Sequence, residues 1–406
     1  MYKLKIPLKD QKALRNVLVL ATAQALVGAQ LPMHFILGGL AGLYLSPNAC
    51  FATLPITMII IGSTLSSPFL SIFMQKFGRR LGFVVGCLFG GLGAAISSLA
   101  IYFNSFTIFV IGTFITGVYM SSYSFYRFAA TDTARRTFRP KAISYVVAAG
   151  LISAILGPQL VKISSNFSPV PFLGSYMVII LLNLIGPFIF VFLDIPITKN
   201  FSKDLNLGNS QVPLLKNNMI ILAIFCGMIS YGLMNLMMTA APLAVVGCGL
   251  SKNNAADVVM AHVLAMAMPS FFTGHLILKY GTRTIIVVGM IFLFLAAIVG
   301  LTGVGLANFV IALIFLGIGW NFSFIGSTTM LANSHQPSER GKIQGINDMF
   351  VFGFVALASL ASGGLMNCAG GDTNIGWQLV SIAMFPLLTV ASLALFALRF
   401  DTTTTK

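Results

Sequence analysis

The chain has 406 residues, of which 57% are hydrophobic and only 8% are charged, and its formal net charge is +15. A soluble protein of this length could not cover its surface with so few charged side chains, so the composition favours a protein that lies in a lipid bilayer. The positive charge does not indicate a nucleic-acid partner, because Lys and Arg occur in short gaps between apolar runs and form no continuous basic stretch.

Twelve apolar runs follow one another along the chain, and each is long enough to cross a bilayer as a helix, which takes about 20 residues. They do not alternate between polar and apolar residues as barrel strands would. We therefore predict an all-α membrane protein with twelve transmembrane helices. The runs are 17–45, 51–73, 81–103, 106–128, 142–163, 172–193, 219–246, 255–278, 285–304, 309–331, 343–366 and 377–398.

The distribution of basic residues predicts the orientation of these helices. If the N-terminus lies in the cytoplasm, 22 of the 24 Lys and Arg residues fall in cytoplasmic segments and only Lys162 and Lys252 lie outside. Lys and Arg are retained on the cytoplasmic side of membrane proteins. We expect both termini to be cytoplasmic, in a bacterial inner membrane, and we find no cleavable signal peptide.

A short basic stretch occurs twice, half a chain length apart, as "QKFGRR" at 75–80 and "LKYGTR" at 278–283. Each copy follows the second helix of one half of the chain. The longest polar stretch separates the two halves. This repeat predicts two pseudo-symmetric six-helix bundles, 1–193 and 219–406, joined by a cytoplasmic linker at 194–218, and such paired bundles are typical of transporters that rock about a central site.

The chain resembles the major facilitator superfamily. The signature of that family after the second helix is G-x-x-x-D-R-x-G-R-R, and the stretch "SIFMQKFGRR" keeps its last Gly and two Arg residues. Gln75 stands where the family has an acidic residue that latches the two halves, so this chain lacks the charge of that latch. The stretches "YRFAATDTA" and "GINDMFVFG" are similar to uncharacterised proteobacterial members and, more distantly, to rhizobial riboflavin importers.

The resemblance implies a conformational role for the repeated basic stretches. Gly permits a tight turn there, and the cations lie at helix ends. The alternative is that these residues only determine topology and bind anionic lipid head groups. The gating candidates are Lys76, Gly78, Arg79, Arg80, Lys279, Gly281 and Arg283.

Three ionisable residues are candidates for proton coupling, because such groups are costly inside a membrane. Asp348 lies about six residues into the eleventh run, and its alternative is an ion pair with Arg340, Lys342 or Arg127. His262 lies inside the eighth run, and His34 lies close after Pro32 in the first. Either histidine could instead be bonded to a neighbouring helix without a role in transport.

The path of the solute is predicted from polar and aromatic residues at membrane depth. Amides and phenols offer neutral hydrogen bonds and aromatic rings offer flat surfaces, so the lining suits a small neutral or anionic planar solute. Each residue could instead only join helices, and Arg127 could extend to the head groups. The candidates are Gln24, Gln30, Tyr119, Tyr123, Arg127, Asn235, Trp320 and Asn321.

These features predict a secondary transporter that works by alternating access, is coupled to protons and acts as a monomer. A drug or metabolite efflux antiporter and a non-transporting receptor remain as alternatives. We expect no enzyme, because the four histidines are scattered and no nucleophile or metal motif is present. We also expect no cofactor and no metal. The five cysteines form no CxxC pair, and we interpret them as apolar fillers, although a disulfide between outward loops is conceivable.

Overall fold

The computed structural model describes residues 8–134, 138–196, 217–334, 340–368 and 372–401, and every regular element in these ranges is a helix. Eleven helical segments are long and apolar enough to span a membrane, and a bent pair makes a twelfth. The prediction of an all-α membrane protein is therefore confirmed. Most of the linker expected at 194–218 lies outside the described residues.

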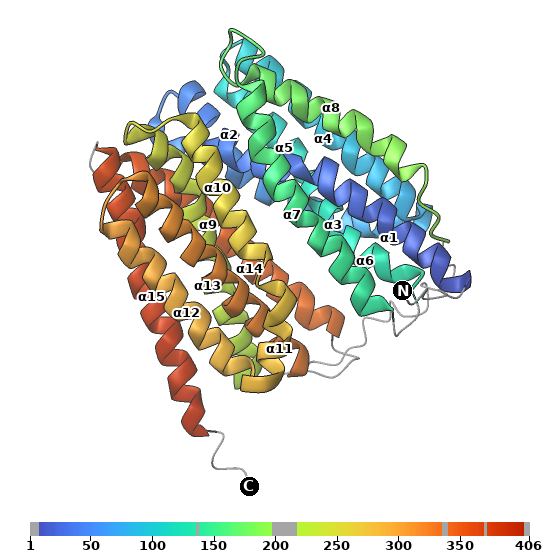
Figure 1. Ribbon diagram of the computed structural model, residues 1–406. Helices are drawn as coiled ribbons and strands as arrows, with labels where there is room; N and C mark the ends of the chain where they lie inside the picture. The colour runs from blue at the N-terminus through green and yellow to red at the C-terminus, as the bar shows by residue number, and fades with distance from the viewer. Residues whose placement is uncertain (1–7, 135–137, 197–216, 335–339, 369–371, 402–406) are drawn as a thin grey trace, which may run out of the picture. The chain divides into compact units, whose positions relative to one another are not determined.

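The contacts divide the chain into two compact units (Figure 1). Unit 1 comprises residues 1–34 and 58–208, and unit 2 comprises residues 35–57 and 209–406. The predicted bundle boundaries stay a prediction, and residues 35–57, which they assign to the first bundle, group with unit 2 by contact.

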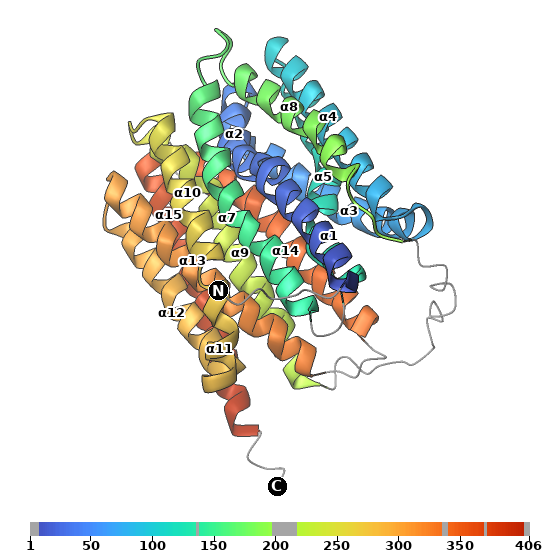
Figure 2. The same cartoon turned by 45° about the vertical axis from the view of Figure 1, so that its right-hand side comes forward.

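The first half of the chain contains eight α-helices and two short 3-10 helices. They are α1 (Leu8–Leu26), η1 (Val27–Ala29), α2 (Gln30–Leu45), η2 (Ala49–Phe51), α3 (Leu54–Phe77), α4 (Arg79–Tyr102), α5 (Phe106–Ser124), α6 (Tyr126–Asp132), α7 (Arg139–Ser164) and α8 (Leu173–Phe190). In unit 1, α4 packs between α5 and α8, and α1 packs on α7; α4 and α8 lie side by side in both views (Figures 1 and 2).

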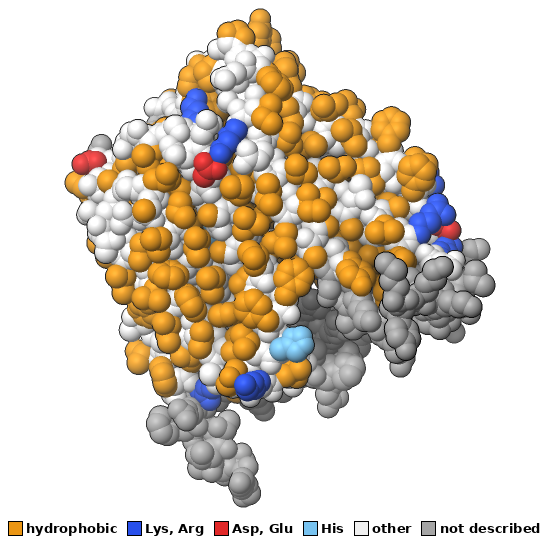
Figure 3. All heavy atoms as spheres, in the orientation of Figure 1, with side chains coloured by type: hydrophobic (Ala, Val, Ile, Leu, Met, Phe, Trp, Pro, Cys, Tyr) orange, Lys and Arg blue, Asp and Glu red, His pale blue; other side chains and the backbone are white. Residues whose placement is uncertain are grey.

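The second half contains seven α-helices. They are α9 (Asn218–Gly247), α10 (Lys252–Ala267), α11 (Ser270–Tyr280), α12 (Thr282–Leu301), α13 (Leu306–Asn333), α14 (Arg340–Cys368) and α15 (Thr373–Asp401). Within unit 2, α9 packs against α13 and α14, and α12 packs against α13 and α15. On the side of unit 2 seen in Figure 3, hydrophobic side chains cover the helices and the few charged ones lie towards the helix ends, as expected for a surface that faces lipid.

Small residues allow the closest helix contacts. A Cβ at Gly93 of α4 would lie 2.6 Å from the carbonyl oxygen of Gly112 in α5. In unit 2 a Cβ at Gly289 of α12 would lie 2.8 Å from the carbonyl oxygen of Gly319 in α13. Such approach of two backbones is the usual way in which helices pack in a membrane.

One predicted span is broken. Helices α10 and α11 together replace the run 255–278, and they meet at an angle of 41° beside Pro269. The break exposes backbone groups that lipid could not satisfy. Asn321 of α13 fills this need, because its Nδ2 donates to the Met266 carbonyl oxygen (2.6 Å) and to Ser270 Oγ (2.7 Å), while its Oδ1 accepts from Thr273 Oγ1 (2.7 Å).

The interpretation of all five cysteines as separate fillers was wrong for two of them. Cys50 and Cys368 form a disulfide within unit 2, whereas Cys87 and Cys226 are buried and unpaired as expected. The pairing could not be deduced from sequence, because the two residues are 318 positions apart and only the packing of α14 brings them together.

Candidate functional site

The two repeated basic stretches have the same backbone conformation. Gly78 ends α3 and begins α4 with φ 92° and ψ 156°, and Gly281 joins α11 to α12 with φ 84° and ψ 154°. This region of backbone space is open almost only to Gly, because any Cβ would be strained. The sequence repeat thus corresponds to the same glycine turn between two helices, which occurs once in each unit.

The cations of the first stretch have different partners. Arg79 Nε donates to Asp132 Oδ2 at 2.8 Å, and its guanidinium lies 5.9 Å from the ring of Phe125. Lys76 lies over Phe77, and Arg80 is exposed. Asp132 thus pairs with Arg79, whereas the exposed Arg127 lies over the ring of Phe128. The pair ties the start of α4 to the end of α6 within unit 1.

The second stretch is anchored through a backbone carbonyl and an aromatic ring. Arg283 Nη2 donates to the carbonyl oxygen of Leu395 in α15, and Lys279 lies 5.0 Å from the ring centroid of Tyr280. The Leu395 carbonyl lies in the last turns of its helix, where the negative end of the helix dipole favours a cation.

Unit 1 contains a cluster of amides and phenols. Gln24 donates to the hydroxyl of Tyr123, whose ring lies 6.3 Å from that of Tyr119. Gln30 and Asn183 bond each other through both amide groups, at 2.9 and 3.2 Å. The buried Gln30 pair has the form of a helix-to-helix link, whereas Gln24 and the partly buried Tyr123 present the more accessible polar groups.

Unit 2 contains a cluster of four aromatic side chains from three helices, here called the unit 2 aromatic cluster. It consists of Tyr231 of α9, Trp320 and Phe324 of α13, and Phe352 of α14. The ring of Tyr231 lies 5.5 Å from Trp320, 5.1 Å from Phe324 and 5.8 Å from Phe352, and Trp320 stacks on Phe324 at 5.2 Å.

The rings of the unit 2 aromatic cluster are not fully covered by the protein. All four side chains are only partly buried, so rings remain accessible at the surface of unit 2. The indole Nε1 of Trp320 is buried and has no hydrogen-bond partner among the described residues. Aromatic rings prefer to stack with offset or edge contacts at 4.5–7 Å, so the partly exposed rings of the cluster can receive one more flat ring.

Sequence reasoning found only Trp320 of this cluster. Phe324 follows it by four residues, which places both on one helix face, so the spacing in "WNFSF" could have revealed the pair. Tyr231 and Phe352 carry no such local signal, because they come from other helices. Asn321 and Asn235 are less suited to a solute: Asn321 is fully bonded at the α10–α11 break, and the buried Asn235 donates to the Val355 carbonyl oxygen at 3.4 Å.

The three proton-coupling candidates occupy different environments. His262 is buried, its Nδ1 donates to the Leu313 carbonyl oxygen at 2.8 Å, and its Nε2 has no partner among the described residues. His34 is also buried, and its ring lies 5.9 Å from that of Tyr176; within the part of the chain that the structure describes, neither of its ring nitrogens is hydrogen-bonded. Asp348 is exposed and accepts from Asn347 Nδ2 at 3.1 Å. The side chains of Arg340 and Lys342 lie outside the described residues.

Hydrophobic spanning helices whose backbones pack through glycines define a multi-pass membrane protein. The model of the Major Facilitator Superfamily matches residues 223–406. The riboflavin transporter RfnT of Brucella anthropi is 40% identical over 381 residues, covering 93% of this chain and 96% of the relative. The uncharacterized MFS-type transporter YddS of Bacillus subtilis is 27% identical over 399 residues, covering 94% and 91%.

The fold agrees with these relatives. A crystal structure of the nucleoside transporter NupG superposes with a TM-score of 0.70 at 16% identity, covering 97% of this chain and 99% of that chain. At this identity the likeness concerns the fold alone. The chain belongs to the Major Facilitator Superfamily.

Proposed function

We propose that this chain is a secondary transporter for a flavin, with riboflavin as the first solute to test. The relative at 40% identity over nearly the whole chain is named a riboflavin transporter, and this observation carries the proposal. The unit 2 aromatic cluster supports it physically, because a flavin ring system is flat and aromatic, and the partly exposed rings of the cluster offer it a stacking surface.

The mechanism we propose is alternating access between two six-helix bundles, 1–193 and 219–406, with both termini in the cytoplasm of a bacterial cell. The glycine turns at Gly78 and Gly281 support an internal repeat. The asymmetric distribution of Lys and Arg supports the cytoplasmic location of both termini. Uptake is coupled to protons through Asp348, His262 or His34, and the monomer is the working unit.

Ligand binding tests the substrate class. Purified protein in detergent is heated with riboflavin, its phosphorylated and therefore anionic form, a nucleoside, a sugar or a lipophilic drug. A ligand present at a hundred times its Kd adds about 2.7 kcal/mol to the folded state. A shift with flavins alone is expected. Comparable shifts with several unrelated drugs and none with flavins would replace this proposal with efflux.

A further inference from the structure

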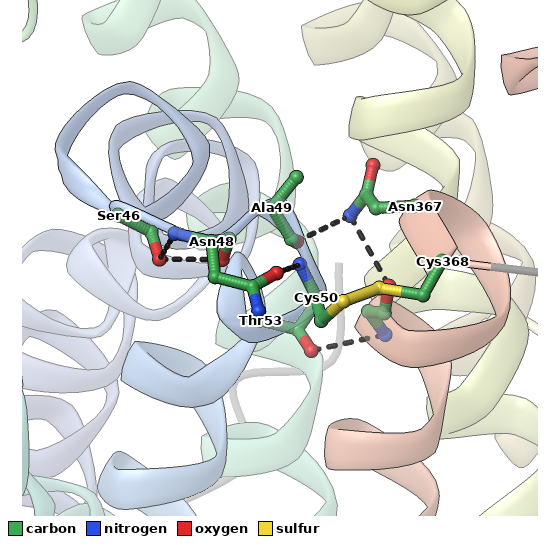
Figure 4. The surroundings of a disulfide bond; sticks show 8 residues. Ser46, Asn48, Ala49, Cys50, Thr53, Asn367 and Cys368 are labelled. Carbon is green, nitrogen blue, oxygen red and sulfur yellow. Dashed lines mark hydrogen bonds between the residues drawn. A yellow bond between two sulfur atoms is a disulfide. The ribbon is translucent and has the colours of Figure 1, made fainter. Parts of the chain in front are cut away.

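A disulfide joins two segments of unit 2 that are far apart in sequence. Cys50 lies in η2, the short helix that connects the first two spanning segments. Cys368 is the last residue of α14, 318 positions later. Their Cα atoms are 5.5 Å apart, within the range that a disulfide requires. Figure 4 shows the bond running from the η2 turn to the end of α14.

Hydrogen bonds hold the same two segments together beside the disulfide. Thr53 Oγ1 donates to the Ser359 carbonyl oxygen at 2.7 Å and accepts from the Gly363 amide at 3.1 Å. Asn367 Nδ2 donates to the Ala49 carbonyl oxygen at 2.9 Å (Figure 4). Residues 359, 363 and 367 are spaced by four, so they form one stripe of α14. These hydrogen bonds between the two segments are neutral and can break individually, whereas the disulfide is covalent.

The segment that the disulfide holds is the hairpin 35–57, here called the tip hairpin. It groups with unit 2 by contact, although the chain on both sides of it belongs to unit 1. The change of unit occurs inside α2, after His34, and inside α3, before Met58. A bond from the tip hairpin to α14 therefore fixes a piece of the first half of the chain to the second half.

Both residues of the disulfide lie at the surface of unit 2. Cys368 is exposed, Cys50 is partly exposed, and the Asn48 side chain fixes the turn by accepting from the Cys50 amide at 2.9 Å. On the proposed topology both cysteines face the outside of the cell, where disulfides form and persist. The bond is thus placed where external redox conditions can act on it.

We propose that Cys50 and Cys368 form a redox-controlled lock, which when oxidised keeps the tip hairpin on α14 and prevents the transporter from opening on that side. This inference rests on the alternating-access part of the proposed function. With the bond reduced, only non-covalent contacts must break for the tip hairpin to leave α14. With the bond present, the separation is blocked whatever the solute.

The chemistry is ordinary thiol–disulfide exchange with an external dithiol–disulfide couple. The thiolate of one cysteine attacks a sulfur of the external disulfide and forms a mixed disulfide, and the second thiolate then displaces the external thiol. The two cysteines lose two electrons and two protons, and the external disulfide becomes a dithiol. Reduction by a dithiol reverses each step.

Thiol counting tests whether the bond forms. The unfolded, unreduced wild type should react with a maleimide at three cysteines, Cys87, Cys226 and Cys248, and at all five after reduction with a phosphine. Peptide mass spectrometry should recover Cys50 and Cys368 linked to each other. Five reactive thiols before reduction, in protein exposed to an external oxidised dithiol, would overturn the proposal.

Hydrogen–deuterium exchange of the full-length protein tests the lock without any solute. Reduction should speed exchange in the tip hairpin and in residues 359–368. The variant Cys50→Ser should exchange like the reduced wild type and should not respond to the phosphine, and Cys248→Ser should respond as the wild type does. Equal exchange in the oxidised and reduced wild type would contradict the lock, and this comparison needs no variant to fold.

Uptake into proteoliposomes completes the test. Uptake scales with the fraction of molecules able to open, so a preparation that is about nine-tenths oxidised should gain ~tenfold on reduction. A redox effect on exchange with no riboflavin uptake in either state would support the lock and refute the flavin proposal. Riboflavin uptake at one rate in both states would refute the lock and leave the flavin proposal standing.

Discussion

Trp320 is the residue on which the proposed flavin site depends most. Replacing it with Ala removes a stacking surface, so riboflavin affinity should fall by about 1–3 kcal/mol, or roughly 5- to 150-fold. Titration of riboflavin fluorescence, which stacking on an aromatic ring quenches, measures this. Trp320→Phe should recover part of the affinity.

The second tryptophan of the chain provides a matched control for this substitution. Trp377 is fully buried and packs 5.0 Å from Phe309 in the core of unit 2. Trp377→Phe should lower the melting temperature but leave riboflavin affinity near that of the wild type. Equal loss of affinity in Trp320→Ala and Trp377→Phe would mean that Trp320 acts through stability and not through contact with the solute.

His262 allows a proton role to be separated from a structural one. Asn at this position keeps a donor near Nδ1 for the Leu313 carbonyl oxygen but has no titratable nitrogen. If His262 carries the coupling proton, His262→Asn should fold like the wild type and lose uptake driven by an imposed pH gradient. Retained gradient-driven uptake would assign His262 to helix packing and shift the proton role to His34 or Asp348.

Among the structural elements, the two glycine turns between helices give the clearest prediction. Gly78→Ala and Gly281→Ala should each cost about 1–3 kcal/mol, because both backbones lie in a region open almost only to Gly. Gly274 of α11 has open space around its Cβ position, so Gly274→Ala should be neutral or slightly stabilising. Thermal unfolding in detergent compares the three, and a neutral Gly281→Ala would contradict the described turn.

Asn321 shows how one side chain supports a broken helix. Asn321→Ala leaves the Met266 carbonyl and the Thr273 hydroxyl without this partner, and should cost about 1–3 kcal/mol. Asn308 of the same helix forms only an exposed bond to Thr302, so Asn308→Ala should change stability by roughly 0.5 kcal/mol or less. Chemical unfolding should show a larger loss of stability for Asn321→Ala than for Asn308→Ala. Equal losses would mean that other contacts stabilise the break between α10 and α11.

At the scale of the whole molecule, the spanning helices could be predicted from sequence because hydrophobic run length is set by bilayer thickness. The turns at Gly78 and Gly281 could be predicted because the repeat preserves glycine. The Cys50–Cys368 bond, the role of Asn321 and the contributions of Tyr231 and Phe352 could not, since each depends on which helices become neighbours. Asn183, the partner of Gln30, was missed for the same reason.

The flavin proposal is tested by riboflavin uptake into proteoliposomes that contain the reduced wild type, measured beside Trp320→Ala. We expect saturable uptake that an excess of unlabelled riboflavin abolishes and a nucleoside does not. Trp320→Ala should take up less at low concentration and recover at high concentration, because affinity is what it loses. Wild-type uptake no faster than in empty liposomes, with or without a pH gradient, would contradict the account.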